Sequence, residues 1–172
     1  SLWCWPISLV ACAFYVVIFL DARLYSDTGL QAVFMGFILY GWYQWLRGKD
    51  AGGEVIVQPL PKKQAALALM IGAIFSAALG WFMHNKTNAD VAYLDAALAG
   101  FSLVAQYWTA RRHAANWIVW IIVDILYVGM FLYKELWMTA GLYAGLVVLA
   151  VIGYRAWTKP KAEAPLAATQ VA

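Results

Sequence analysis

Residues 116–124 read NWIVWIIVD, a run of tryptophan, isoleucine and valine that ends in an acid, Asp124. The run opens a longer apolar stretch over residues 116–134, and 65% of the 172-residue chain is hydrophobic. Only 12% is charged, about half the share that a soluble domain carries. The mean hydropathy is +0.69. This composition excludes an ordinary soluble protein and predicts an all-α integral membrane protein in which Asp124 lies inside the bilayer.

Apolar stretches recur along the whole chain, and each is long enough to cross a membrane as a helix. About 20 helical residues rise about 30 Å, the thickness of the hydrocarbon core. A β-barrel is a poor alternative, because the stretches do not alternate polar and apolar residues. No metal site or cofactor is expected, since the cysteines and histidines lie at unrelated spacings. We predict six transmembrane helices, over residues 1–20, 28–46, 64–83, 91–110, 116–134 and 136–157.

Basic residues fall mainly on one side of the predicted bundle. Because successive helices alternate in direction, nine Lys and Arg residues gather on one face and three on the other. This excess places the segment 47–63 and the C-terminus on the cytoplasmic side. The charges are spread over loops beside lipid, so no nucleic-acid surface is expected. The basic face holds Arg47, Lys49, Lys62, Lys63, Arg111, Arg112, Arg155, Lys159 and Lys161.

Residues 5–45 are repeated in residues 117–157. An offset of 112 gives eleven identities over 41 positions without a gap. The two copies cross the membrane in the same direction, as in a parallel repeat about an axis along the membrane normal. The helix over 91–110 has no counterpart before residue 1, so the repeat predicts one further helix there. The alternative is a six-helix protein with unequal halves. The identical pairs include Trp5 with Trp117, Tyr15 with Tyr127, Gly41 with Gly153 and Trp45 with Trp157.

The repeat divides the chain into parts. Residues 1–46 form the second and third helices of the first repeat, and 64–83 form a linker helix. Residues 91–157 form the second three-helix repeat. The cytoplasmic link 47–63 contains Pro59 and Pro61, which exclude helix there. Residues 158–172 are predicted to be a disordered cytoplasmic tail. The expected architecture is therefore a three-one-three bundle like that of the SWEET sugar carriers.

One helical stripe combines aromatic rings with the buried acid. Trp117, Trp120, Asp124 and Tyr127 are spaced 3, 4 and 3 residues apart, which places them on one helix face. An ionisable group near the bilayer centre costs at least about 2.5 kcal/mol and usually faces a cavity or a partner. Indole and phenol rings beside a carboxylate suit a heteroaromatic or cationic ligand. The alternative is that Asp124 pairs with a neighbouring helix and that the tryptophans are packing or interfacial residues, the latter especially for Trp117 beside the cytoplasmic link.

Two glutamines are further candidates for ligand contacts. The side-chain amide of Gln106 can donate to and accept from a carboxamide. Gln31 is the deep polar group of its own helix, and the alternative for it is a hydrogen bond between helices. A separate aromatic group at the inner end of the helix over 28–46 is interpreted as an interfacial belt rather than a site; it comprises Tyr40, Trp42, Tyr43 and Trp45.

Three stretches carry a family resemblance: LYSDTGLQAVFMGFILYGWYQW over 24–45, NWIVWIIVD followed by Tyr127, and LYAGLVVLAVIGYRAW over 142–157. Together they resemble the PnuC family of bacterial vitamin transporters, particularly its nicotinamide riboside branch. The YGWYQW segment and the WxxWxxxD pattern with its preceding Asn116 are specific in combination, whereas each alone is a weak signal. The resemblance implies a ligand pocket that involves the stripe Trp117, Trp120, Asp124 and Tyr127, with Gln106 and its neighbours on the helix over 91–110. Asn116 is a further candidate contact. Ile38 stands where some relatives have asparagine, so a polar contact from that position is in doubt.

The resemblance also implies a function. It implies facilitated diffusion of nicotinamide riboside across the bacterial inner membrane, made one-way by a cytoplasmic nucleoside kinase. The alternatives are a thiamine or riboflavin transporter of the same family, and a SWEET-like sugar carrier. Proton coupling through Asp124 is the alternative to downhill movement. An enzyme is not expected, because the sequence has no HExxH or GxSxG motif. The expected assembly is a homo-oligomer, with a trimer as the candidate.

Overall fold

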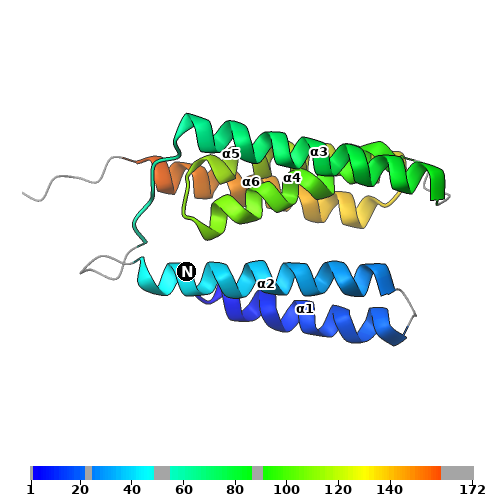
Figure 1. Ribbon diagram of the computed structural model, residues 1–172, viewed down its shortest axis with the longest axis horizontal. Helices are drawn as coiled ribbons and strands as arrows, with labels where there is room; N and C mark the ends of the chain where they lie inside the picture. The colour runs from blue at the N-terminus through cyan, green and yellow to red at the C-terminus, as the bar shows by residue number, and fades with distance from the viewer. Residues whose placement is uncertain (1, 22–24, 49–54, 87–90, 160–172) are drawn as a thin grey trace, which may run out of the picture.

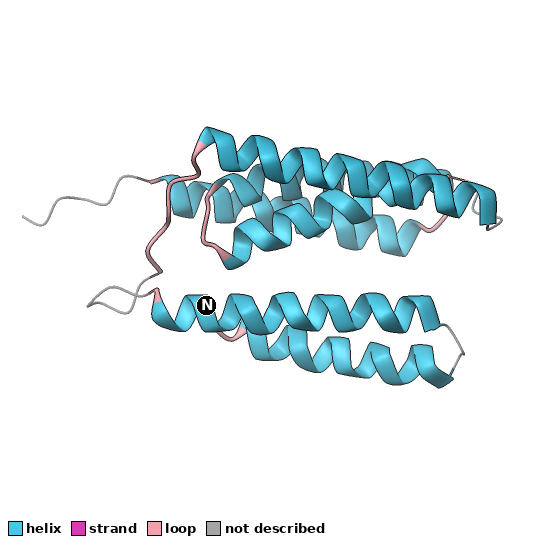
Figure 2. Ribbon diagram, in the orientation of Figure 1, coloured by secondary structure: helices cyan, strands magenta, loops and turns pink. Residues whose placement is uncertain are grey.

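The computed structural model describes residues 2–21, 25–48, 55–86 and 91–159, and these ranges contain six α-helices (Figures 1 and 2). This confirms the predicted all-α, six-helix fold. At 1.5 Å per residue the helices are about 27 to 38 Å long, enough to cross a hydrocarbon core of about 30 Å. The helices are α1 (Cys4–Asp21), α2 (Tyr25–Arg47), α3 (Lys62–Lys86), α4 (Ala92–Ala110), α5 (Ala115–Tyr133) and α6 (Trp137–Thr158).

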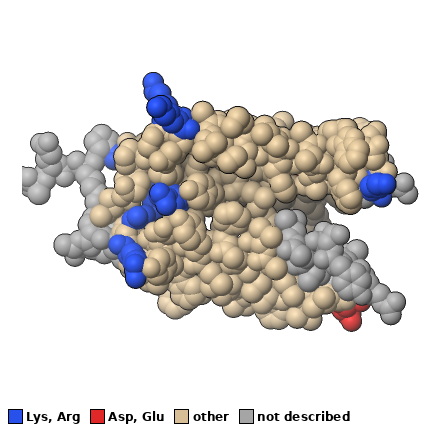
Figure 3. Space-filling model, in the orientation of Figure 1, with Lys and Arg blue, Asp and Glu red and all other residues tan. Residues whose placement is uncertain are grey.

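The outer surface of the helices suits a lipid environment. Within the described residues, α3, α5 and α6 satisfy a strict requirement of length and hydropathy for a membrane span, and α1 has a shorter apolar stretch, Cys4–Val17. Large apolar side chains on several helices face outward, among them Phe14, Ile74 and Leu142. Figure 3 shows most of the visible Lys and Arg atoms at the end of the bundle where α2 ends and α3 begins. The apolar sides and basic end are those of a multi-pass membrane protein.

The helices pack as three antiparallel hairpins, α1–α2, α3–α4 and α5–α6. Helix α4 lies at the centre of the contacts, because it packs on α5 as well as on α2. In Figure 1 the α1–α2 hairpin forms one layer and α3 to α6 form the other, in which α4 lies nearest to α2. Helix α4 is therefore the main link between the first hairpin and the rest of the bundle.

Small residues bring α3 and α4 close together. Gly72, Ser76 and Gly80 recur every four residues on one side of α3, and all three are buried. A Cβ added at Gly100 of α4 would overlap the Ser76 hydroxyl, and one added at Gly72 would lie 2.7 Å from Val104. This spacing of small residues is a common way for membrane helices to approach closely. It fastens α3 to α4 along most of their length.

Two helices end in the same hydrogen-bonded turn, a Schellman C-cap. Each turn places a residue other than glycine in the left-handed region, with φ of 63° at Arg112 and 58° at Glu135. This conformation costs a non-glycine residue about 1 to 2 kcal/mol. After α4, the backbone N–H of His113 donates to the Trp108 carbonyl, and that of Arg112 donates to the Thr109 carbonyl. After α5, the N–H of Leu136 donates to the Phe131 carbonyl, and that of Glu135 donates to the Leu132 carbonyl.

The segment between α2 and α3 is fastened to the turn between α4 and α5. The backbone N–H of Gln58 donates to the Arg112 carbonyl at 2.9 Å, and its carbonyl contacts Nδ1 of His113 at 3.1 Å. One guanidinium nitrogen of Arg112 donates to the Gly48 carbonyl at 2.7 Å. A Cβ at Gly48 would overlap that guanidinium, so the contact depends on glycine. Residues 49–54 of the predicted link, and 160–172 of the predicted disordered tail, lie outside the described residues.

Candidate functional site

The sequence repeat is visible in the side-chain packing at the basic end of the bundle. A Cβ added at Gly41 would overlap the indole ring of Trp5. A Cβ added at Gly153 would lie 2.6 Å from the ring of Trp117. The offset of 112 residues equates both the two glycines and the two tryptophans. The same packing, an indole against a glycine of the next helix, is therefore present in both halves.

Four tryptophans form one continuous group, here termed the tryptophan tetrad: Trp5, Trp45, Trp117 and Trp157. The rings of Trp5 and Trp45 meet edge to face with centroids 5.3 Å apart, and those of Trp117 and Trp157 do so at 5.5 Å. Trp45 and Trp157 lie 5.7 Å apart and complete the group. Because the offset equates Trp45 with Trp157, the axis that relates the halves passes between these two rings. The tetrad joins the halves at the basic end.

Thr109 of α4 holds two indoles by their N–H groups. Nε1 of Trp45 donates to the Thr109 carbonyl at 2.9 Å, and Nε1 of Trp120 donates to its hydroxyl at 3.2 Å. The indole N–H groups of Trp5 and Trp117 are buried without a hydrogen-bond partner within the described structure. Thr109 therefore fixes one tryptophan of the tetrad and one of the predicted ligand stripe.

The prediction that Trp45 belongs to an interfacial belt is wrong. Its side chain is only 6% exposed and belongs to the core between the halves. Tyr43 does face outward, and its ring lies 4.4 Å from the guanidinium of Arg47. The aromatic residues of this helix end therefore divide between core and surface. Composition alone did not distinguish the two, because an interfacial and a buried tryptophan can occupy the same depth.

A central cavity of about 340 Å³ lies between the α1–α2 hairpin and α4. Gln31 of α2 and Gln106 of α4, both predicted ligand contacts, line it together with Cys12 and Tyr15 of α1. Ile38 also lines it and is buried, so this part of the wall is apolar. The cavity combines two amides and a phenol in an apolar surround. That combination suits a small polar ligand with a flat ring.

The predicted stripe on α5 occupies the corresponding position in the other half. The offset equates Cys12 with Asp124 and Tyr15 with Tyr127, so the two sets face the pseudo-symmetry axis from opposite sides. Asp124 is only 4% exposed, and it has no hydrogen bond or ion pair within the part of the chain that the structure describes. A buried carboxylate without a counter-charge is costly. This cost makes Asp124 a candidate contact for a ligand.

Aromatic rings of α5 and α6 surround one side of the acid. The rings of Tyr127 and Tyr143 have centroids 4.7 Å apart, and Phe131 stacks on Tyr127 at 5.7 Å. Tyr143 lies close enough to interact electrostatically with Asp124 and with Tyr15 across the axis. Tyr143 thus connects the α5 stripe with the central cavity. Of the residues that line the central cavity, Tyr15 is the one with which Tyr143 interacts.

Asn116 and Trp117 lie apart from this group. The side-chain amide of Asn116 is fully buried and donates to the His113 carbonyl at 2.5 Å, which fastens the turn before α5. Its Oδ1 has no partner among the described residues. Trp117 belongs to the tryptophan tetrad. The structure therefore brings Gln31 and Gln106 together and groups Asp124 with Tyr127, with Trp120 one turn nearer the tetrad.

Two residues of this region were missed by the sequence reasoning. Tyr143 is the repeat equivalent of Gln31, so extending the offset from identical pairs to all pairs finds it. Thr109 gives no such signal, because threonine is unremarkable in a membrane helix and its partners are 64 and 11 residues away. No group of three or more metal-ligating side chains occurs in the described ranges.

Comparisons with known proteins agree with this architecture. The family model described as nicotinamide mononucleotide transporter matches residues 1–159. The riboflavin/roseoflavin transporter RibM of Streptomyces davaonensis is 30% identical over 166 residues, covering 91% of this chain and 75% of the relative. The nicotinamide riboside transporter PnuC of Escherichia coli is 24% identical over 174 residues, covering 87% and 73%.

A solved structure shows the same fold. The crystal structure of the vitamin B3 transporter PnuC superposes with a TM-score of 0.69 at 19% identity, covering 92% of this chain and 72% of that one. The matching proteins are transporters rather than enzymes, in agreement with the sequence-based expectation. The chain belongs to the PnuC family of vitamin transporters, and it is a multi-pass membrane transporter of a small molecule.

Proposed function

We propose that this protein mediates facilitated diffusion of nicotinamide riboside into the cytoplasm. The observation that carries the proposal is Asp124, a buried carboxylate without a counter-charge among the described residues, beside the rings of Tyr127 and Tyr143. The nicotinamide ring of this nucleoside carries a positive charge, because its nitrogen bears the sugar. A cationic aromatic ring would complement both the carboxylate and the phenol faces.

The proposed ligand site spans both halves. Asp124, Tyr127 and Trp120 contact the cationic ring from α5, and Gln31 and Gln106 hydrogen-bond the carboxamide or ribose from the central cavity. Each amide offers both donors and acceptors to such groups. Two predicted contacts take a different role in this proposal: Trp117 acts within the tetrad as part of the cytoplasmic closure, and Asn116 orders the turn before α5.

Transport follows from movement of the halves about the site. The tetrad joins the halves at the basic end, so its separation would open the central cavity to that side. The excess of basic residues at this end supports a cytoplasmic link and C-terminus. Movement is downhill, and phosphorylation by a cytoplasmic nucleoside kinase retains the product. A homo-oligomer, with a trimer as the candidate, is the proposed assembly.

Riboflavin is the second candidate cargo, because the RibM relative named above is a riboflavin transporter. Riboflavin also has a flat heteroaromatic ring and a polyol chain, but its ring is neutral. The buried wall at Ile38 would suit its larger apolar ring. The two candidates therefore differ in their need for the Asp124 charge.

Calorimetric titration of the purified protein with nicotinamide riboside, riboflavin and thiamine tests the cargo. We expect nicotinamide riboside to bind most tightly. Asp124→Asn should weaken its binding by more than about tenfold, or about 1.4 kcal/mol, and should leave riboflavin binding little changed. Asp21→Asn, the same charge change at an exposed helix end, is the matched control. Tighter riboflavin binding in the wild type, indifferent to Asp124→Asn, would transfer the assignment to riboflavin.

Transport in proteoliposomes tests the mechanism. Nicotinamide riboside should equilibrate across the membrane at the same final level with or without an imposed pH gradient. Accumulation above equilibrium in the absence of a kinase would contradict facilitated diffusion and favour proton coupling. Trp120→Ala should slow uptake, whereas Trp137→Ala, a change at an exposed residue of α6, should not.

A further inference from the structure

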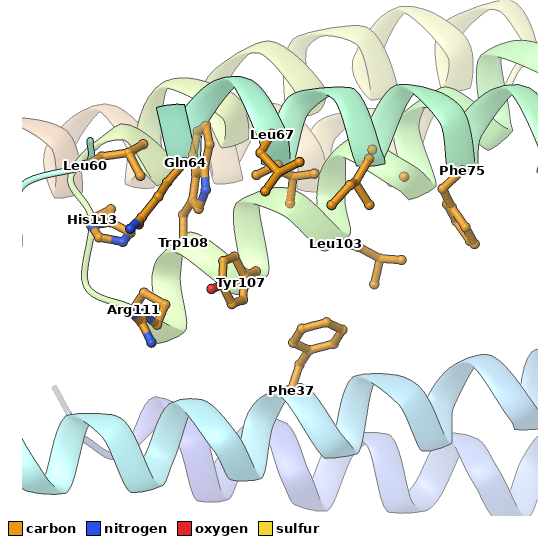
Figure 4. A pocket seen from close by; sticks show the side chains of 15 residues that line it. Phe37, Leu60, Gln64, Leu67, Phe75, Leu103, Tyr107, Trp108, Arg111 and His113 are labelled. Carbon is orange, nitrogen blue, oxygen red and sulfur yellow. The ribbon is translucent and has the colours of Figure 1, made fainter. Parts of the chain in front are cut away.

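A second cavity, of about 480 Å³, lies between α2 and the α3–α4 pair, and neither proposed ligand glutamine lines it. Its walls are apolar along most of their length, with Phe37 from α2, Leu67 and Phe75 from α3, and Leu103 from α4. Figure 4 shows Phe37 and Leu103 pointing toward each other across this space. The cavity is therefore bounded by both layers of the bundle and offers a continuous hydrocarbon surface.

The cavity becomes polar at the basic end. Arg111, His113 and Gln64 line its end and also line an adjoining cavity of about 380 Å³, to which Arg112 adds a second positive charge. No acidic residue is among the described residues that line either cavity. Nη1 of Arg111 donates to the Tyr40 hydroxyl at 3.3 Å, which uses one of its five N–H donors. A fixed guanidinium therefore stands where the apolar and polar cavities meet.

The length of the apolar part matches one leaflet of a bilayer. From Gly100 to Arg111 the wall formed by α4 and its C-cap covers twelve residues, a rise of about 16 Å. Gln64 to Phe75 of α3 covers the same length on the opposite wall. Half of a hydrocarbon core of about 30 Å is about 15 Å. An acyl chain that ends in a charged headgroup would fill the apolar part and leave its headgroup at the guanidinium.

We propose that the joined cavities bind one anionic phospholipid of the cytoplasmic leaflet, with an acyl chain against Phe37 and Leu103 and its phosphate at Arg111. Basic pockets between membrane helices on the cytoplasmic side favour such headgroups, and a guanidinium can bind phosphate through two parallel hydrogen bonds. The orientation rests on the proposed cytoplasmic basic end, but the binding itself is independent of the cargo. Because its walls come from α2 and from α3–α4, the lipid bridges the two layers.

Two variants and two matched controls address the headgroup and the chain separately. Arg111→Gln removes the charge at the junction, and Arg155→Gln removes an exposed charge of α6 at the same end of the bundle. Ala68→Phe fills the apolar cavity from its α3 wall, and Ala66→Phe adds the same ring to an exposed position of α3 outside the cavity. Arg111→Gln loses the hydrogen bond to Tyr40 and for that reason could fail to fold. Ala68→Phe keeps this hydrogen bond and therefore tests the lipid site independently.

Native mass spectrometry of delipidated protein, titrated with phosphatidylglycerol or phosphatidylcholine, measures the binding. We expect one phosphatidylglycerol to bind about tenfold more tightly than phosphatidylcholine. Arg111→Gln should abolish that preference, Ala68→Phe should weaken both lipids, and the two controls should match the wild type. Millimolar inorganic phosphate should not displace the lipid, which separates a lipid site from a free-phosphate site.

Several results would overturn the proposal. Equal binding of the two lipids to the wild type would remove the anionic preference, and unchanged binding in Ala68→Phe would place the lipid elsewhere. If the protein forms an oligomer that binds no lipid, the cavity is covered by a second copy of the chain. That result would assign the cavity to a subunit interface in place of a lipid site. Titration of nicotinamide riboside in the same samples distinguishes these failures from failure of the proposed transport function.

Discussion

Replacement of Gly41 by alanine tests whether the tryptophan tetrad holds the two halves together. The added Cβ would overlap the ring of Trp5, which is buried and only 3% exposed. Carbon atoms in contact normally lie about 3.5 to 4.0 Å apart. Either the ring or one of the helices α1 and α2 must therefore shift, and the edge-to-face contact with Trp45 is lost.

The expected magnitude follows from two opposing effects. Overpacking a close contact typically costs about 1 to 3 kcal/mol, and loss of an aromatic pair adds about 0.5 to 1.5 kcal/mol. Alanine is favoured over glycine within a helix by about 1 kcal/mol. The net effect is a destabilisation of about 0.5 to 3.5 kcal/mol. Gly36 lies on the same helix with nothing within 4 Å of an added Cβ, so Gly36→Ala retains only the favourable part.

Thermal unfolding of the purified variants, followed by size-exclusion chromatography with fluorescence detection, measures the difference. Gly41→Ala should unfold at a lower temperature than the wild type, and Gly36→Ala at the same or a higher temperature. Gly153→Ala should behave like Gly41→Ala, because its added Cβ meets Trp117. Equal unfolding temperatures for Gly36→Ala and Gly41→Ala would show that the indole moves without cost and would refute the assignment of a rigid tetrad.

Further outcomes follow from the contacts of α4 and the helix ends. Thr109→Val leaves the Trp120 N–H without its acceptor and should weaken ligand binding in calorimetry. Thr109→Ser keeps the hydroxyl and should bind ligand like the wild type. Equal binding by both variants would contradict a positioning role for Thr109. Glu135→Gly should stabilise the protein by about 1 kcal/mol, because glycine adopts the left-handed conformation without strain, and an unchanged or lower unfolding temperature would argue against that strain. Arg112→Gly should raise the unfolding temperature less than Glu135→Gly does, because it also loses the hydrogen bond to the Gly48 carbonyl.

The helices and the repeat were predictable from the sequence because both depend on local or periodic signals. Apolar length alone indicates a span, and α3 departs from its predicted range by only a few residues at each end. The repeat relies on tryptophan, tyrosine and glycine, whose shapes are hard to exchange. The structure supplies the reason for one glycine pair: Gly41 and Gly153 each receive the indole of the preceding helix.

The detailed site could be predicted only in part. Helical spacing correctly placed Asp124 and Tyr127 on one face, but it could not show that Asn116 turns back to the His113 carbonyl. Gln31 and Gln106 meet in one cavity through the contact of α2 with α4, a pairing that no local pattern indicates. Trp45 was assigned to the membrane interface because it clusters with other aromatic residues at the inner end of its helix, a pattern that does not reveal its contact with Trp157. Tertiary contacts decided each of these cases.

The contact of Trp45 with Trp157 also bears on how such a chain arises. In an assembly of two identical subunits, a residue on the two-fold axis touches its own copy in the partner. These two tryptophans are repeat equivalents with ring centroids 5.7 Å apart, so a single chain retains the geometry of a homodimer interface. A substitution at this seam disturbs both halves at once, which favours identity there. Positions away from the seam, such as Cys12 and Asp124, could specialise separately.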